Sequence, residues 1–139
     1  MLPLRFPRRW HLASVVLLLA VLLAMLMPAV WLFPHPGEFA GWFGEIDKWL
    51  HGVSFAVLAI WFAGLYGRSA YWRIALSLLA FGMLIEVCQR LVGYRTADWL
   101  DVAADVGGIA IGLVVGAAGA GGWALHVESW MAGTVQGDG

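Results

Sequence analysis

Long apolar runs separated by short polar stretches organise this chain. Four of them, at about residues 12–33, 49–66, 72–92 and 102–125, approach or reach the length that a helix needs to cross a bilayer. A helix satisfies all of its backbone hydrogen-bonding groups internally, as an apolar surrounding requires. The pattern therefore predicts an all-α fold: one membrane domain over residues 1–139, built as a four-transmembrane-helix bundle with short connections.

The stretches between the runs predict how the helices are joined. Residues 67–71 and 93–100 are short connections, so the helices that they join should be antiparallel neighbours. After Pro34, apolar residues recur at helical spacing between acidic ones, which predicts a short amphipathic segment in the headgroup region before the second span. The first run is longer than the apolar core of a secretory signal, so we expect it to be retained as a helix. We expect disorder beyond Trp130.

Composition favours a membrane protein and excludes several other classes. Hydrophobic residues make up 62% of the 139 residues and charged residues 12%, against about 25% charged in a typical soluble domain. A soluble chain this short could not hide so much apolar surface in one core. The net charge of −1 gives no case for nucleic-acid binding, and the single cysteine, Cys88, cannot form an intramolecular disulfide.

Basic residues near the helix ends predict the orientation. Cytoplasmic loops of membrane proteins carry an excess of Lys and Arg. One side of the predicted bundle has Arg5, Arg8, Arg9, Arg68 and Arg73, and the other has Lys48, Arg90 and Arg95. We therefore expect a multi-pass protein with both termini in the cytoplasm.

Polar and ionisable residues from three stretches fall at the opposite, outward-facing end of the predicted bundle. An ionisable group at membrane depth costs about 2.5–3.5 kcal/mol on insertion scales, so it usually has a partner or a functional role. Glu86 lies about six residues inside its helix end, too deep for a surface charge. The whole set is Asp47, Lys48, His51, Glu86, Gln89, Arg90, Arg95, Asp98, Asp101 and Asp105.

Helical spacing predicts which of these side chains share a face. Asp47 and His51 are four residues apart, as are Asp101 and Asp105. The second pair continues the line of a small-residue ridge, which lets another helix approach closely and should turn the two aspartates into the bundle. The ridge consists of Gly108, Gly112 and Gly116.

The cluster carries an excess of negative charge, and the sequence leaves open how this excess is relieved. A carboxyl group could hold a proton, His51 could be protonated, or a cation could bind. A structural polar lock that fixes helix register is a further alternative, and Asp98 could cap the fourth helix. One histidine among carboxylates is a weak zinc signal, so we predict neither a metal nor a cofactor.

The order and spacing of these residues resemble those of the VanZ-like family of small bacterial membrane proteins. The family is named after a protein associated with resistance to the glycopeptide antibiotic teicoplanin. This chain departs from the family pattern at Asp105, where Asn is frequent, and at Phe55, where Tyr is frequent. The resemblance covers a core of about residues 47–116 and rests on Asp47-Lys48-x-x-His51, Glu86-x-x-Gln89, Arg95, Asp101, Asp105, Gly108 and Gly112.

The resemblance implies a cell-envelope protein of the bacterial inner membrane, possessing an outward-facing polar pocket. In the leading hypothesis this pocket binds an anionic lipid headgroup or a lipid-linked cell-wall precursor, and a link to glycopeptide resistance follows from the family name. A guanidinium matches phosphate or carboxylate oxygens in a bidentate way, so Arg95 would grip the anionic group. Glu86, Asp101 and Asp105 would hold Arg95, a proton or a cation. Asp47 and His51 would complete the pocket, with Lys48 and Gln89 beside them.

Two other functions remain open from the residues alone. In a membrane enzyme acting on a similar substrate, His51 or Glu86 would be the general base and Arg95 would stabilise developing charge. The usual hydrolase, zinc-protease and phosphate-loop motifs are absent from the sequence. In a small proton-coupled transporter the buried carboxylates would relay protons, and four helices would then need a homo-oligomer. For the lipid-binding protein and for the membrane enzyme alike, the predicted partner is a membrane lipid or lipid-linked precursor.

Overall fold

The protein is a bundle of helices. The computed structural model describes residues 1–27, 40–92 and 99–135, with the side chains of 40–46 and 133–135 outside the described set. This described part is helical and contains no strand, which confirms the predicted all-α class. Its long helices are α1 (Pro7–Leu26), α3 (Ala40–Leu65), α4 (Tyr71–Val92), α5 (Trp99–Val115) and α6 (Trp123–Val135).

Four segments are long and apolar enough to cross a membrane: Pro7–Leu26, Asp47–Leu65, Arg68–Val92 and Trp99–Ala120. Large aliphatic side chains on these segments point outward instead of into the bundle. Leu23 is 66% exposed and Val114 is 67% exposed, and such surfaces are stable only against lipid or another apolar phase. The chain is therefore a membrane protein with four candidate spans.

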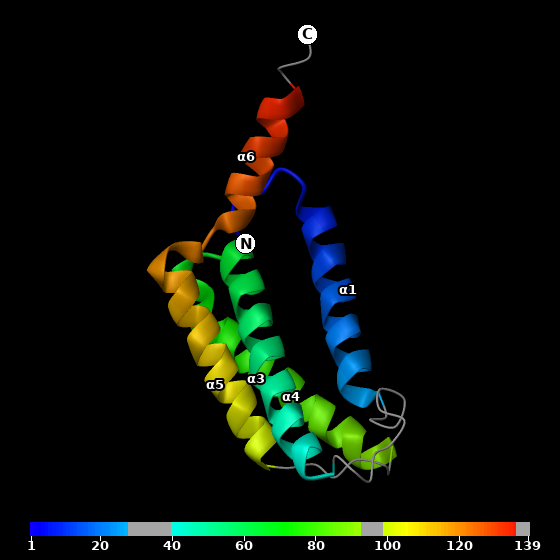
Figure 1. The fold of residues 1–139 in the computed structure, drawn as a ribbon. Helices are drawn as coiled ribbons and strands as arrows, with labels where there is room; N and C mark the ends of the chain where they lie inside the picture. Colours follow the sequence, from blue (N-terminus) through cyan, green and yellow to red (C-terminus); the bar gives the residue numbers. More distant parts are fainter. Residues whose placement is uncertain (28–39, 93–98, 136–139) are drawn as a thin grey trace.

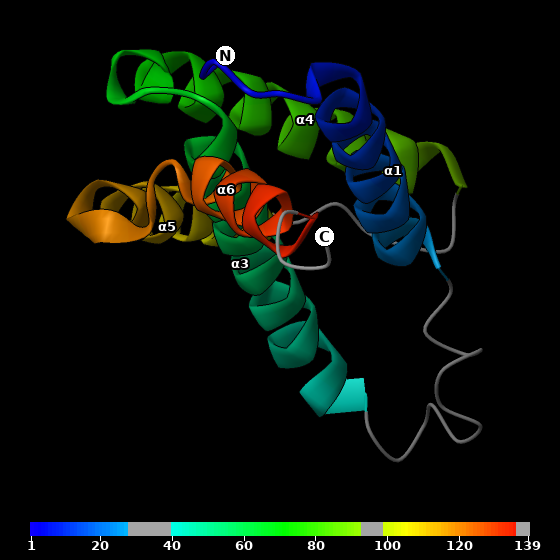
Figure 2. The same cartoon turned by 90° about the horizontal axis from the view of Figure 1, so that it is seen from above.

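The spans alternate in direction, which brings distant segments together at one end. Figures 1 and 2 show α3 between α1 and α5, and the beginning of α3 and of α5 lies at the same end as the last turns of α4. The end of α1 joins them, because Gln89 Nε2 of α4 donates a hydrogen bond to the carbonyl of Met25 at 3.0 Å. This end of the bundle carries the predicted polar residues.

The closest packing is between α3 and α5. A Cβ added to Gly108 would collide with the backbone of Gly52, and one on Gly112 would lie 2.6 Å from the Cβ of Ala59. Only a missing side chain permits such an approach. The prediction that the small-residue ridge lets another helix approach closely is thus confirmed, and that helix is α3.

The first two spans begin earlier than the sequence predicted. Pro7 occupies the start of α1, where its fixed φ and missing N–H suit a helix N-terminus, so α1 begins at residue 7 and not 12. The amphipathic segment expected before the second span is continuous with it, since α3 runs unbroken from Ala40 to Leu65. Residues 40–46 are thus helical and precede the candidate span that begins at Asp47, and their place in the headgroup region stays a prediction. The rest of the expected segment and Pro34 lie outside the described residues.

The fourth span also ends differently. The sequence predicted one helix over residues 102–125, whereas the structure breaks it with a π turn at Gly116–Ala120. Gly119 and Gly122 adopt φ values of 144° and 76°, which glycine tolerates far better than other residues. The chain then forms α6, which projects from the bundle in Figure 1. Disorder beyond Trp130 is corrected as well, because α6 continues to Val135.

The end of the bundle opposite the polar residues is held by aromatic rings and one carboxylate. Trp10, Trp61 and Trp123 pack with ring centroids 5.2–5.8 Å apart. Beside them, Glu128 of α6 accepts hydrogen bonds from the backbone N–H of Arg5 and Phe6 and from the Trp10 indole, at 2.6–3.0 Å. These contacts fix the N-terminal segment against α6.

Candidate functional site

A buried histidine–aspartate pair joins α3 to α5 within the bundle. His51 Nδ1 lies 2.9 Å from Asp105 Oδ1, and both side chains are fully buried. With its proton on Nδ1, the imidazole donates to the carboxylate, which fixes the orientation of the ring. Helical spacing explains the placement of each partner. His51 lies one turn after Asp47, and Asp105 continues the Gly108 line that faces α3.

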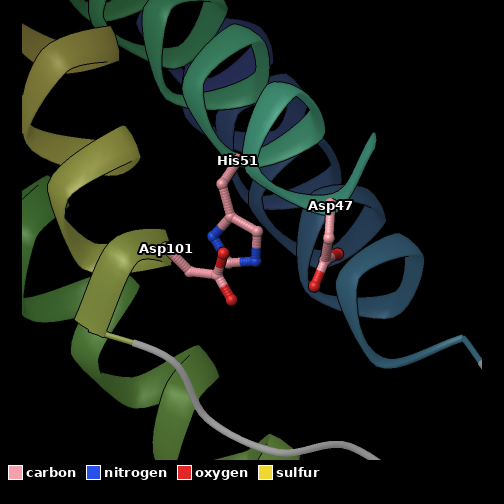
Figure 3. A group of neighbouring side chains, drawn as sticks. All are labelled: Asp47, His51 and Asp101. Carbon is pink, nitrogen blue, oxygen red and sulfur yellow. The ribbon is translucent and has the colours of Figure 1, made fainter. Parts of the chain in front are cut away.

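Two further carboxylates approach the same histidine. One ring nitrogen of His51 and one oxygen each of Asp47 and Asp101 lie within 4.8 Å of one another. Figure 3 shows the His51 ring beside the Asp101 carboxylate, with Asp47, one turn before His51 on α3, pointing toward the same space. Asp101 is buried, whereas Asp47 is half-buried, so this part of the site lies nearer the end of the bundle.

Glu86 of α4 supplies a fourth carboxylate. It is 6% exposed and lies within electrostatic reach of Asp101, His51 and Asp105. Its Oε1 atom is buried and has no hydrogen-bond partner among the described residues. We call Asp47, His51, Glu86, Asp101 and Asp105 the acid–histidine cluster.

The sequence predicted all five members of this cluster, and the structure brings them together. Gln89 is buried, and its hydrogen bond to the Met25 carbonyl joins α4 to α1. Lys48 is half-buried at the edge of the site, and Arg90 is exposed on α4. Arg95 and Asp98 lie outside the described residues.

A groove runs along the bundle surface beside the acid–histidine cluster. It lies between α3 and α5, has a volume of about 420 Å³, and falls in the range of about 300–1,000 Å³ typical of ligand sites. Its wall is apolar apart from Lys48 at one end. The lining residues include Trp49, Gly52, Val53, Ala104 and Gly107. Sequence reasoning missed this groove, although the small residues on both helices were a usable signal.

Gly82 is a second position that sequence reasoning missed. A Cβ on Gly82 would collide with the Asp105 carboxylate and would lie 3.3 Å from the Phe55 ring. The absence of a side chain there lets α4 approach the histidine–aspartate pair. The signal was present in the spacing, because Gly82 lies one turn before Glu86 and shares its face.

The charge of the acid–histidine cluster is unbalanced. Among the described residues, four carboxyl groups of the cluster lie near one histidine, and Lys48 of α3 is a basic residue at its edge. Carboxylates this close and this buried repel each other when all are ionised, which favours a shared proton or a shared cation in the described part of the site. The arrangement therefore suits proton transfer or cation binding, and it disfavours direct contact with an anion.

No family model, no curated protein and no solved structure matches this chain.

Proposed function

We propose that this chain is a VanZ-like protein of the bacterial inner membrane that binds a lipid or lipid-linked cell-wall precursor at the outer end of its bundle. Both termini would be cytoplasmic, in keeping with the arginines near the N-terminus and in the α3–α4 connection. The motif spacing supports the family, and the membrane-spanning helices with a shared polar end support the setting.

One observation carries the binding proposal: the apolar groove between α3 and α5 ends at Lys48, beside the acid–histidine cluster. An acyl chain fits the apolar wall, and a lysine at the groove end suits an anionic headgroup. Arg95, which the sequence places in the α4–α5 connection, would be the second headgroup contact. The four carboxylates would repel an anion, so their role in the proposal is to hold Arg95, a proton or a cation.

Native mass spectrometry of the detergent-purified chain tests this proposal. The probes are phosphatidylglycerol and phosphatidylcholine with identical acyl chains. We expect preferential retention of phosphatidylglycerol, and we expect Lys48→Gln to remove the preference. Arg90→Gln is the matched control, because Arg90 is an exposed cation that does not line the groove. Equal retention of both lipids by the unaltered chain would contradict an anionic-headgroup site.

The groove itself has its own pair of variants. Val53 lines the groove and is 56% exposed, whereas Val57, one turn later, is 50% exposed and does not line it. Val53→Trp should therefore lower retention of both lipids, and Val57→Trp should not. Equal effects of the two variants would show that the lipid binds elsewhere.

The histidine–aspartate pair favours one second candidate, a membrane enzyme that acts on a lipid-linked substrate. A general base needs an orienting partner on one ring nitrogen and a lone pair on the other, and the Asp105 contact leaves His51 Nε2 in that state. In this case His51→Gln would abolish conversion of the lipid while retention of the lipid persists. Absence of any product with the unaltered chain, across lipid-linked substrates that it retains, would exclude this candidate.

A further inference from the structure

The His51 side chain has one ring nitrogen committed and one available. Nδ1 is bonded to Asp105, whereas Nε2 is buried and has no hydrogen-bond partner among the described residues. Burying a polar atom without a hydrogen-bond partner is unfavourable, because the atom loses its contact with water and gains none in return. In a side chain that is 0% exposed, such an atom is a position where a bound ion would supply the missing contact.

The surroundings of this nitrogen are suited to a cation. The Asp47 and Asp101 carboxylates each place an oxygen within 4.8 Å of a His51 ring nitrogen, and Figure 3 shows them converging on the ring. Ligand atoms held about 2.0–2.2 Å from one metal ion lie at most about 4.4 Å apart, so a small inward movement of the two carboxylates would bring all three atoms onto a single ion. The three ligands come from α3 and α5, the most closely packed helices, so the site is held on rigid elements.

Asp105 completes the arrangement found around metal-bound histidines. Histidine ligands commonly donate their second ring N–H to a carboxylate, which fixes the tautomer and orients the coordinating nitrogen. The 2.9 Å contact between His51 Nδ1 and Asp105 Oδ1 has this geometry. A bound cation would also offset the negative charge of the cluster, including that of Glu86.

We propose that Asp47, His51 and Asp101 form a binding site for one divalent transition-metal ion, with Asp105 as the residue that positions His51. One imidazole and two carboxylates suit an ion of borderline hardness, such as Zn²⁺ or Mn²⁺, better than Mg²⁺ or Cu⁺. The sequence alone predicted no metal, because one histidine among scattered carboxylates is a weak signal. The fold makes the difference by bringing two carboxylate oxygens close to the ring of a buried histidine whose Nε2 has no hydrogen-bond partner among the described residues.

The test is metal titration of the full-length chain, purified in detergent with a tag that contains no histidine. Isothermal titration calorimetry and native mass spectrometry are carried out with ZnCl₂, MnCl₂ and MgCl₂. We expect saturable binding of one Zn²⁺ or Mn²⁺ ion per chain, with Mg²⁺ weaker. Asp101→Asn should abolish saturable binding, and Asp105→Asn should weaken it by about 10–100-fold, as is typical for residues that orient a ligand.

Two controls keep this test decisive. Asp101→Asn leaves the His51–Asp105 pair in place, so loss of metal binding can be separated from loss of folding by circular dichroism. His126→Gln removes an exposed histidine of α6 at the other end of the bundle and should leave the affinity unchanged. Absence of saturable Zn²⁺ and Mn²⁺ binding would overturn the proposal, as would binding that survives Asp101→Asn and His51→Gln or disappears with His126→Gln.

The metal site goes beyond lipid binding and does not depend on it. Metal titration in detergent proceeds without added lipid, and lipid retention is measured by separate variants in the groove. Retention of lipid without metal binding would support the proposed function and contradict the metal site. Metal binding without preferential lipid retention would support the metal site and contradict the proposed function. A metal on Nε2 would also remove that atom as a general base, so metal binding argues against the enzyme candidate in the form given above.

Discussion

His51 of α3 and Asp105 of α5 are 54 residues apart in the chain, yet their side chains meet at 2.9 Å in a fully buried contact. The two helices are brought to this spacing by glycines that let their backbones approach. The contact therefore depends on both the polar residues and the small-residue ridge. Each can be tested separately.

Removal of the Asp105 carboxylate should destabilise the protein. Asp105→Ala leaves the buried Nδ1–H of His51 without an acceptor, and the loss should be about 1–3 kcal/mol of unfolding free energy. Asp105→Asn is the matched control, because its side-chain oxygen can still accept the bond, and its loss should be smaller. The measurement is equilibrium unfolding in mixed micelles. Equal stability of Asp105→Ala and the unaltered chain would show that the pair contributes nothing to the fold.

Glu86→Gln should have the opposite effect on stability. The substitution preserves the size of the side chain and removes the cost of a buried carboxyl group whose Oε1 has no described partner. We expect the free energy of unfolding in detergent to be unchanged or raised by about 0.5–2 kcal/mol, as for residues that are retained for function at a cost in stability. The structural polar lock makes a different prediction. If Glu86 only fixes helix register, Glu86→Gln should lower the unfolding temperature.

Neighbouring glycines on α5 should respond very differently to a methyl group. Gly108→Ala drives a Cβ into the backbone of Gly52 and should cost about 1–3 kcal/mol through overpacking. Gly107→Ala meets nothing within 4 Å, so the change should be neutral, or stabilising by up to about 1 kcal/mol through helix propensity. Thermal unfolding followed by circular dichroism distinguishes the two. Similar losses for both variants would contradict the close packing of α3 on α5.

The acid stability of the protein should depend on Glu128. Burial alone would raise the pKa of this carboxyl, but the hydrogen bonds from Arg5, Trp10 and Phe6 outweigh it and hold the pKa below its ordinary value of 4.5. A lowered pKa in the folded state means that the ionised carboxylate stabilises the protein above pH 4.5, and this contribution is lost as the pH falls through the folded pKa.

Glu128→Gln isolates this contribution from the other carboxyl groups. The variant should unfold at a lower temperature than the unaltered chain at pH 7, and the difference should shrink below pH 4.5. The measurement is the unfolding temperature of both chains between pH 7 and pH 3. A difference that stays constant over this whole range would contradict the assignment.

Much of the fold follows from apolar length and from the positions of glycines. The four long apolar segments and the receiving ridge at Gly108 and Gly112 were predictable, because a helix that crosses lipid leaves little choice of structure. The end of α5 was not, since the run from residue 106 to 125 carries no charged residue. The break depends on the backbone angles of Gly119 and Gly122, which composition does not reveal.

The acid–histidine cluster was predictable for a topological reason. Alternate crossings return every second helix end to the same side, so the charges at the starts of α3 and α5 and near the end of α4 had to meet. Which members of the cluster pair with each other was harder to predict. Residue spacing alone offers no reason to choose Asp105 over Asp101 as the partner of His51, because this choice depends on the rotation of α5 against α3. Gln89 likewise bonds Met25 on α1, a helix outside the region of the family resemblance.

Sidedness labelling tests most directly whether the starts of α3 and α5 share one end of the bundle. Single cysteines are introduced as Lys48→Cys, Trp99→Cys and Arg68→Cys in a Cys88→Ala chain, and intact cells are treated with a membrane-impermeant maleimide. We expect positions 48 and 99 to react together from outside the cell, and position 68 to react only after permeabilisation. Reaction of 48 and 99 from opposite sides of the membrane would contradict the account.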